Sequence, residues 1–289
     1  MTAPRLITGL SELAPAYDAL ICDVWGVIHD GHKAHPAAVE ALIHFRKKHG
    51  PVVLLTNAPR RADSVAALCA GYGVPPDCYD AIVSSGEAAR DALARESAAG
   101  TLPLYYIGPD KDLPVMEGLD LDLTGIAEAR LAMCTGLLDD LTETPEDYAD
   151  RLAAMRARNL TMICANPDLV VHRGTRLVYC AGSLAKDYEA LGGQVIYYGK
   201  PHLPVYQAAL AAAALAAQAA NRQSPKRALA VGDGLLTDIK GANAAGLDVL
   251  FIADGVHGEE IAPYTDEHMA ALFSRFGANA GTVTRKLAW

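Results

Sequence analysis

Five short runs of apolar residues, three near the start of the chain and two near its end, are nearly continuous and do not alternate with polar positions. They are ALICDVW (19–25), PVVLLTN (51–57), AIVSS (81–85), ALAVGD (228–233) and DVLFIAD (248–254). Continuous runs of this length are typical of strands in a parallel sheet, because such strands are covered on both faces. The pattern predicts five buried parallel strands.

The segments between these runs have the spacing of amphipathic helices. Residues 35–50 (HPAAVEALIHFRKKHG) carry apolar side chains three or four positions apart and end in glycine, and residues 60–73 (RRADSVAALCAGYG) end in the same way. Glycine is common just beyond a helix C-terminus. Strands that alternate with helices predict a doubly wound α/β core, in which functional side chains gather at the carboxyl ends of the strands.

The middle of the chain predicts a second α/β unit. Residues 144–147 (TPED) form a strong helix start, with a capping residue, a proline and two acids. We therefore expect a core formed by residues 1–85 and 188–289, with an α/β cap domain inserted at 86–187. Residues 194–201 (QVIYYGKP) are expected to lead back into the core.

Composition narrows the classes of partner. The chain has 289 residues and a net charge of −9, with no basic stripe, which argues against nucleic-acid binding. The longest apolar stretch, residues 208–220, is too short and too small-sided to cross a membrane. The six scattered cysteines contain no C-x-x-C pair and predict reduced thiols. We expect a cytoplasmic protein, and the acidic balance also suits a metal enzyme.

Four stretches place reactive side chains where predicted strands end or a new helix begins. The residues are Asp23, Thr56 with Asn57, Lys200, and the pair Asp233 and Asp238. Carboxylates are the ligands that Mg²⁺ prefers, and it shares them with a phosphate. Lys200 and Thr56 can neutralise and hydrogen-bond phosphoryl oxygens, and Asp23 can act as a nucleophile. This set predicts phosphoryl-transfer chemistry on a small phosphorylated metabolite.

The order of these residues along the chain resembles the haloacid dehalogenase (HAD) superfamily. The middle insert and the stretches ANPD and GKP are similar to its class IIA branch, which includes NagD-like, p-nitrophenyl phosphatase and pyridoxal phosphatase groups. The resemblance implies a Rossmann-like core with a parallel sheet, an inserted α/β cap, Mg²⁺ dependence and a phosphomonoester substrate. Cap-to-cap homodimers also occur in the family.

The same resemblance implies a role for each matching residue. Asp23 would be nucleophile and metal ligand, and Trp25 would offer its backbone carbonyl to the metal. Asp233 would be a direct ligand, and Asp238 either a ligand or a partner of the ligands. Thr56 and Lys200 would hold the phosphoryl group, and Asn57 is a further candidate for catalysis and substrate binding.

Trp25 departs from the family pattern, because the phosphatases carry Asp-x-Asp and this chain carries Asp23-Val24-Trp25. The missing aspartate normally protonates the leaving oxygen and then activates water, and an indole N–H can do neither. Three interpretations stay open: a slow phosphatase, with His29 as a substitute proton carrier in one version; a metal- and phosphate-binding protein with little turnover; and a dehalogenase-like hydrolase. The two acids of GDGLLTD favour a metal and speak against the dehalogenase.

Three further residues are candidates for substrate binding. Arg60 follows the Thr56-Asn57 pair, and both a contact to a substrate anion and a surface position are open for it. Asn166 and Asp168 belong to the stretch ANPD in the predicted cap. That stretch is either a tight turn or a loop that faces the substrate.

Overall fold

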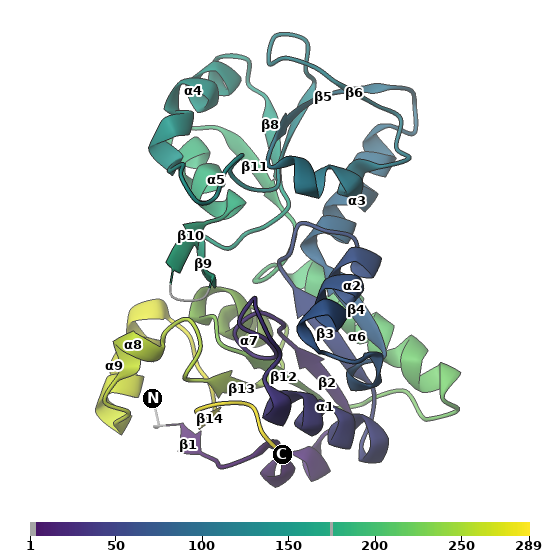
Figure 1. Ribbon diagram of the computed structural model, residues 1–289, viewed down its shortest axis with the longest axis vertical. Coiled ribbons are helices and arrows are strands. Elements are labelled where there is room, and N and C mark those ends of the chain that lie inside the picture. Colours follow the sequence, from purple (N-terminus) through teal and green to yellow (C-terminus); the bar gives the residue numbers. More distant parts are fainter. Residues whose placement is uncertain (1–3, 174–175) are drawn as a thin grey trace.

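The computed structural model describes residues 4–173 and 176–289, and its two lobes each contain a parallel sheet (Figure 1). Strands of the larger sheet lie in the order β1–β14–β13–β12–β2–β3–β4. Their bounds are Arg5–Leu6 (β1), Ala19–Cys22 (β2), Val52–Thr56 (β3), Ala81–Ser84 (β4), Ala228–Gly232 (β12), Asp248–Ile252 (β13) and Thr282–Thr284 (β14). Five of these seven strands lie within the five predicted apolar runs, and all pair in parallel.

Helices cover both faces of the larger sheet. Leu20 and Leu54 point into a core that includes Phe45 of α1 (Pro36–Lys48) and Val65 of α2 (Ala62–Tyr72). Their neighbours along the strands point to the opposite face. The helices on that face are α6 (Leu203–Ala219), α7 (Lys240–Ala244) and α9 (Asp266–Phe276). Burial on both faces explains why the strands read as continuous apolar runs.

The smaller sheet has the strand order β11–β8–β7–β5–β6 and is also parallel. Its strands are Leu102–Ile107 (β5), Leu121–Leu123 (β6), Leu131–Cys134 (β7), Thr161–Cys164 (β8) and Gln194–Tyr197 (β11). Two separate cores flank it. One contains side chains of α4 (Ala149–Ala157) and α5 (Ala181–Ala190), and the other those of α3 (Ser85–Glu96) and η4 (Asp110–Met116).

The remaining elements are short. An antiparallel ribbon is formed by β9 (Val170–Arg173) and β10 (Arg176–Tyr179). The helical turns are η1 (Leu10–Glu12), η2 (Ala14–Ala16), η3 (Pro76–Cys78), η5 (Pro145–Tyr148), η6 (Leu235–Ile239) and α8 (Gly258–Ile261). In the described part of the chain, no helix combines the length and apolar character that a membrane crossing requires.

Strand β11 corrects one detail of the predicted organisation. Residues 194–197 were expected to lie in the core, beyond a boundary at 187, yet β11 pairs with β8 of the smaller sheet. The chain therefore returns to the larger lobe after Tyr197. The division into a core and an inserted cap remains a prediction, with its second boundary moved to this point.

Reactive side chains gather where the strands end. Asp23 follows β2, Thr56 ends β3 and Asp233 follows β12. Lys200 comes three residues after β11, so one strand of the smaller sheet also runs toward this edge. Parallel strands bring their carboxyl ends to one edge, which places Asp23 near Asp233. The short segment after β11 brings Lys200 to the same edge, where it contacts Asp23, 177 positions away in the sequence.

Candidate active site

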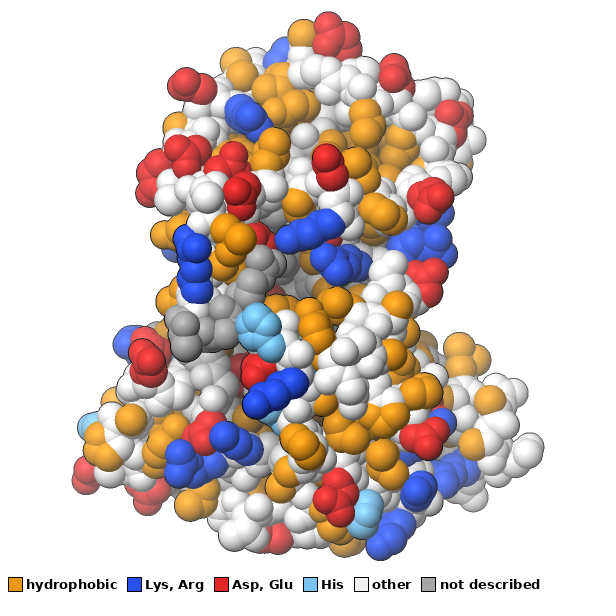
Figure 2. Space-filling view, in the orientation of Figure 1, with side chains coloured by type: hydrophobic (Ala, Val, Ile, Leu, Met, Phe, Trp, Pro, Cys, Tyr) orange, Lys and Arg blue, Asp and Glu red, His pale blue; other side chains and the backbone are white. Residues whose placement is uncertain are grey.

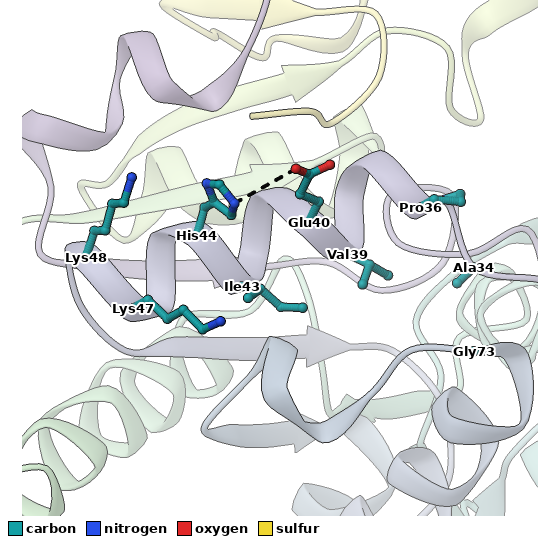
Figure 3. A pocket seen from close by; sticks show the side chains of 9 residues that line it. All are labelled: Ala34, Pro36, Val39, Glu40, Ile43, His44, Lys47, Lys48 and Gly73. Atoms are coloured by element: carbon teal, nitrogen blue, oxygen red, sulfur yellow. Dashed lines mark ion pairs between the residues drawn. The ribbon is translucent and has the colours of Figure 1, made fainter.

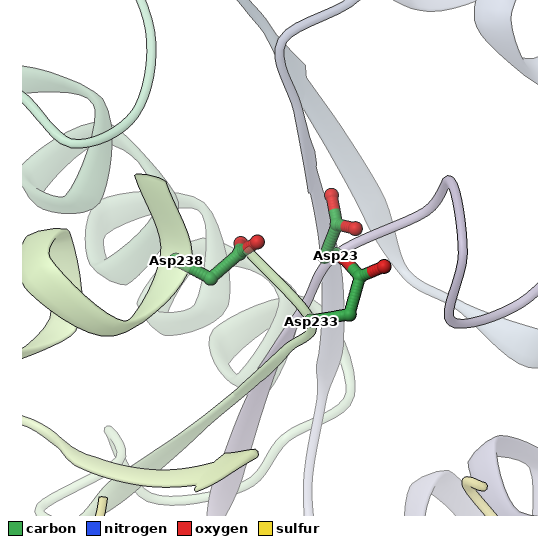
Figure 4. Close-up of side chains that lie close together, drawn as sticks. All are labelled: Asp23, Asp233 and Asp238. Carbon is green, nitrogen blue, oxygen red and sulfur yellow. The ribbon is translucent and has the colours of Figure 1, made fainter. Parts of the chain in front are cut away.

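Three carboxylates meet at the carboxyl edge of the larger sheet (Figure 4). Asp23 follows β2, Asp233 follows β12, and Asp238 lies on the η6 turn that leads into α7. One oxygen of each carboxylate lies within 4.8 Å of the others, and all three residues are buried. The backbone N–H of Asp23 donates to the carbonyl of Val231 (2.8 Å), which ties the end of β2 to β12.

Lys200 joins two members of this carboxylate cluster. Its Nζ donates to Asp23 Oδ1 and to Asp238 Oδ1, the latter at 2.8 Å, and the side chain is 3% exposed. Burial alone would lower the pKa of Lys200, but the carboxylates of Asp23 and Asp238 raise it well above its ordinary value. The ammonium is therefore charged at neutral pH.

The cluster carries more negative charge than one lysine can balance. Burial, and next the Asp238 carboxylate, raises the pKa of Asp233 to about 7. Burial and Asp238 also raise the pKa of Asp23 above its usual range, against the opposing effect of Lys200. A backbone N–H of Val256 donates to Asp233 Oδ2 at 2.8 Å. Raised carboxyl pKa values indicate a site where an additional cation would be stabilised.

The donor set fits a hard divalent cation such as Mg²⁺, which takes oxygen ligands and often shares them with a phosphate. Asp23, Asp233 and Asp238 could each supply one carboxylate oxygen. The backbone at Gly26 approaches the cluster closely, since a Cβ built there would lie 2.2 Å from Asp233 Oδ2. The loop that carries Trp25 therefore borders the same cluster. The expected contribution of the Trp25 carbonyl remains a prediction.

Thr56 and Asn57, both predicted to bind substrate, have different surroundings. Thr56 is buried at the end of β3, and its hydroxyl accepts a hydrogen bond from Ala58 N (3.2 Å). The amide of Asn57 donates to the Lys200 carbonyl (3.1 Å) and accepts from the Lys200 N–H (2.7 Å). It also contacts Ser85 and Asp168. A primary amide has two donor and two acceptor positions, so protein groups occupy the whole side chain and it is not available to a substrate.

Arg60 is also engaged by the protein. Its Nε donates to Asp112 Oδ1 at 3.0 Å, and Asp112 is 4% exposed in the η4 turn of the smaller lobe. This ion pair joins the two lobes through Nε. A contact of Arg60 with a substrate anion stays a prediction. Nothing in the sequence near Arg60 pointed to a partner 52 positions away.

The ANPD stretch forms a tight turn that faces the site. Asn166 Oδ1 accepts from the Asp168 N–H (3.2 Å), as in an Asx turn. The Asp168 carboxylate accepts from Asn57 Nδ2 (3.0 Å). Burial raises the pKa of Asp168, with Lys200 opposing. The stretch is therefore a tight turn that brings one carboxylate to the larger lobe. Its contact with substrate stays a prediction.

Trp25 and His29 form one packed unit. Their ring centroids lie 5.3 Å apart in a T-shaped arrangement, and His29 packs in the same way on Tyr72 (4.9 Å). His29 Nδ1 accepts from the Gly31 N–H (3.1 Å). Burial, and next His35, lowers the pKa of His29 to about 4. A buried imidazole with this pKa is neutral at pH 7 and poorly suited to replace the missing aspartate.

The surface of the protein has two further features. Figure 2 shows Lys and Arg side chains around the hollowed waist between the lobes. A separate groove of about 380 Å³ lies along α1, lined by residues that include Val39, Ile43, His44 and Lys47 (Figure 3). None of the clustered carboxylates lines this groove.

Comparison with known proteins identifies the family. A family model described as haloacid dehalogenase-like hydrolase matches residues 20–122, and a second, HAD-hydrolase-like, matches residues 197–276. The chain is 30% identical over 259 residues to the D-glycerol 3-phosphate phosphatase of Mycobacterium tuberculosis, covering 89% of this chain and 69% of that protein. The chain belongs to the haloacid dehalogenase-like hydrolase family.

Other members of the family extend the comparison. Ribonucleotide monophosphatase NagD of Escherichia coli is 27% identical over 243 residues, covering 82% of this chain and 88% of NagD. A crystal structure of a haloacid dehalogenase-like hydrolase from Brucella suis is 41% identical, with a TM-score of 0.85, and the match covers 98% of this chain and 100% of that one. The fold class and the class IIA resemblance are confirmed.

One solved relative contains a metal. The glycerol phosphate phosphatase of Mycobacterium tuberculosis has been solved in complex with calcium, at 26% identity and a TM-score of 0.63, over 88% of this chain and 71% of that one. The calcium in the structure of this relative agrees with the oxygen-rich donor set described above.

Proposed function

We propose that this protein hydrolyses a small phosphomonoester with the help of a divalent cation, Mg²⁺, held by Asp23, Asp233 and Asp238. The observation that carries the proposal is the buried cluster of three carboxylates with the Lys200 ammonium between two of them. The named phosphatase activities of two relatives support the same class of reaction.

Asp23 is the proposed nucleophile. Its carboxylate attacks the phosphorus, the bond from phosphorus to the leaving oxygen breaks, and an aspartyl-phosphate forms on Asp23. Water then attacks this phosphorus and breaks its bond to the Asp23 oxygen, which releases inorganic phosphate and restores the carboxylate. The water loses a proton to the solvent, and the leaving oxygen takes one from the solvent. Bound Mg²⁺ would neutralise charge on the phosphoryl oxygens. Lys200 and the Thr56 hydroxyl would bind the remaining oxygens and orient the phosphoryl group.

Trp25 makes the proposed reaction slow. Loss of a general acid or base typically lowers a rate by about 10²–10⁴-fold. The described contacts of His29 offer no replacement, since its ring is packed between Trp25 and Tyr72. We therefore expect phosphoryl transfer to Asp23 to be easiest for aryl phosphates, whose leaving groups need no proton. The aspartyl-phosphate should accumulate.

A protein that binds Mg²⁺ and phosphate with little turnover is the second candidate, and Trp25 is the observation that favours it. A dehalogenase is disfavoured because it has no use for two additional buried carboxylates beside Asp23.

Rapid mixing with p-nitrophenyl phosphate tests the proposal. With Mg²⁺, we expect a burst of p-nitrophenol approaching one equivalent, followed by slow turnover, and no burst with a chelator. Asp23→Asn should abolish the burst while keeping the fold. Release that is equally fast with a chelator, or in Asp23→Asn, would refute the mechanism. Phosphate binding with no release of p-nitrophenol would favour the second candidate.

A further inference from the structure

Asn57 connects three chain segments through one buried amide. Its Oδ1 accepts from the Lys200 N–H and from Ser85 Oγ (3.2 Å), and its Nδ2 donates to the Lys200 carbonyl and to Asp168 Oδ1. The residue is 3% exposed. All four hydrogen-bonding positions of the amide are thereby used.

The three segments are the places where the two lobes meet. Ser85 begins α3, directly after β4 of the larger sheet, and Lys200 follows β11 of the smaller one. Asp168 lies on the ANPD turn of the smaller lobe. Asn57 itself follows β3 and therefore belongs to the larger lobe. The Asn57 side chain thus contacts the segment where the chain leaves the larger lobe, at Ser85, and the segment where it returns, at Lys200. It also contacts a loop of the smaller lobe, at Asp168.

Close packing leaves little freedom at this junction. Gly199 has a φ of +127°, and a Cβ built on it would lie 2.0 Å from Ser85 Oγ and 2.5 Å from Asn57 Oδ1. Neither atom could give way without breaking its hydrogen bond. The position of the Lys200 backbone is therefore set by Asn57 and its neighbours.

The Lys200 backbone in turn determines what its ammonium can reach. Asn57 holds both the N–H and the carbonyl of Lys200, while Nζ lies between Asp23 and Asp238. A shift of the ANPD turn would act on Asn57 through Asp168 and be passed to this backbone. Displacement of a catalytic group by about 1 Å can cost on the order of 10²-fold in rate.

We propose that Asn57 is a positioning residue that places the Lys200 ammonium for reaction only when Asp168 of the smaller lobe is hydrogen-bonded to it. Asn57 acts through Lys200 and needs no contact with the substrate. The inference rests on the proposed function, because its main readout is turnover.

A double-mutant cycle between Asn57 and Asp168 tests the coupling with p-nitrophenyl phosphate and saturating Mg²⁺. Asp168→Ala should lower kcat about tenfold when Asn57 is present and by less than about twofold in Asn57→Ala, since coupled residues are not additive. Asp168→Asn keeps an oxygen that can accept from Asn57 and should retain most of kcat. Equal losses in both backgrounds, or a change in KM alone, would overturn the proposal in favour of direct substrate contact by Asp168.

Asn243→Ala is the matched control. Asn243 likewise donates to the carbonyl (2.8 Å) and accepts from the N–H (3.0 Å) of one residue, Asn279, but it is exposed and lies outside the carboxylate cluster. We expect its kcat to be unchanged. Should Asn57→Ala lose stability, the comparison of Asp168→Ala with Asp168→Asn still tests the proposal, because equal kcat values in these two variants would overturn it.

The coupling between Asn57 and Asp168 can also be measured without turnover. If the wild type releases no p-nitrophenol, the proposed function fails, and calorimetry of inorganic phosphate binding with Mg²⁺ replaces kcat. Non-additive losses of phosphate affinity would support the role of Asn57. Additive losses, or no phosphate binding by the wild type, would overturn it.

Discussion

Binding of Mg²⁺ should depend strongly on pH, because Asp233 must release a proton before it can act as a ligand. Burial, and next the Asp238 carboxylate, raises the pKa of Asp233 to about 7. With this pKa the carboxyl is roughly one-tenth ionised at pH 6 and roughly nine-tenths ionised at pH 8. The apparent Kd for Mg²⁺ should therefore fall about tenfold between pH 6 and pH 8.

The same raised pKa changes the stability of the metal-free protein in the opposite direction. The folded pKa of Asp233 lies above the ordinary value of 3.8, so the folded state binds the proton more tightly than the unfolded chain. Its contribution to stability is complete below about pH 4 and is lost as the pH rises through about 7. A shift of about three pKa units corresponds to roughly 4 kcal/mol.

Isothermal calorimetry at several pH values measures the affinity, and thermal denaturation with and without Mg²⁺ measures the stability. Asp233→Asn should bind Mg²⁺ weakly and lose the pH dependence contributed by this residue. Asp122→Asn, which changes an exposed carboxylate on β6, is the control and should behave like the wild type. A wild-type Kd that stays within about twofold between pH 6 and pH 8 would refute this account of the cluster.

Three further predictions concern the surroundings of the cluster. Lys200→Met leaves Asp23 without its buried cation, so the metal-free protein should lose about 3–5 kcal/mol of stability. Saturating Mg²⁺ should restore part of this stability. Identical metal-free denaturation curves for variant and wild type would contradict this prediction. Trp25→Asp restores the missing carboxylate and should raise steady-state turnover of alkyl phosphates by about 10²-fold or more, measured by phosphate release. No gain in a folded, Mg²⁺-binding variant would disprove our explanation of Trp25. Asp112→Asn weakens the ion pair with Arg60 and should cost about 1–3 kcal/mol in urea denaturation, whereas an unchanged midpoint would mean that this contact between the lobes is energetically neutral.

Much of the fold could be predicted because strands that are buried on both faces have apolar residues at consecutive positions. The runs 19–25 and 228–233 are continuous for that reason, and they form adjacent strands β2 and β12. The run at 194–197 was assigned to the larger lobe and lies in the smaller one. Apolar residues look alike whichever parallel sheet they join, so the pattern could not distinguish the two.

The candidate site could be predicted about as far as the fold. Asp23 and Asp233 could be expected at one edge, since parallel strands of one sheet end together. Lys200 also lies there, although the strand before it belongs to the smaller sheet. The contacts of Asn57 could not be foreseen, because they join it to residues 28, 111 and 143 positions away. An amide has no preferred sequence spacing for such partners. A role in binding substrate was therefore the natural prediction for Asn57.

The short segment between β11 and Lys200 limits how this chain can be recombined with its relatives, in the laboratory or during evolution. Only Tyr198 and Gly199 separate the last strand of the smaller lobe from the lysine. If the smaller lobe of another protein were grafted onto this chain, the last strand of the donor lobe would therefore have to end at the same distance from the carboxylate cluster. Recombination between relatives should tolerate changes in the loops of that lobe much better than a change of one residue in this spacer.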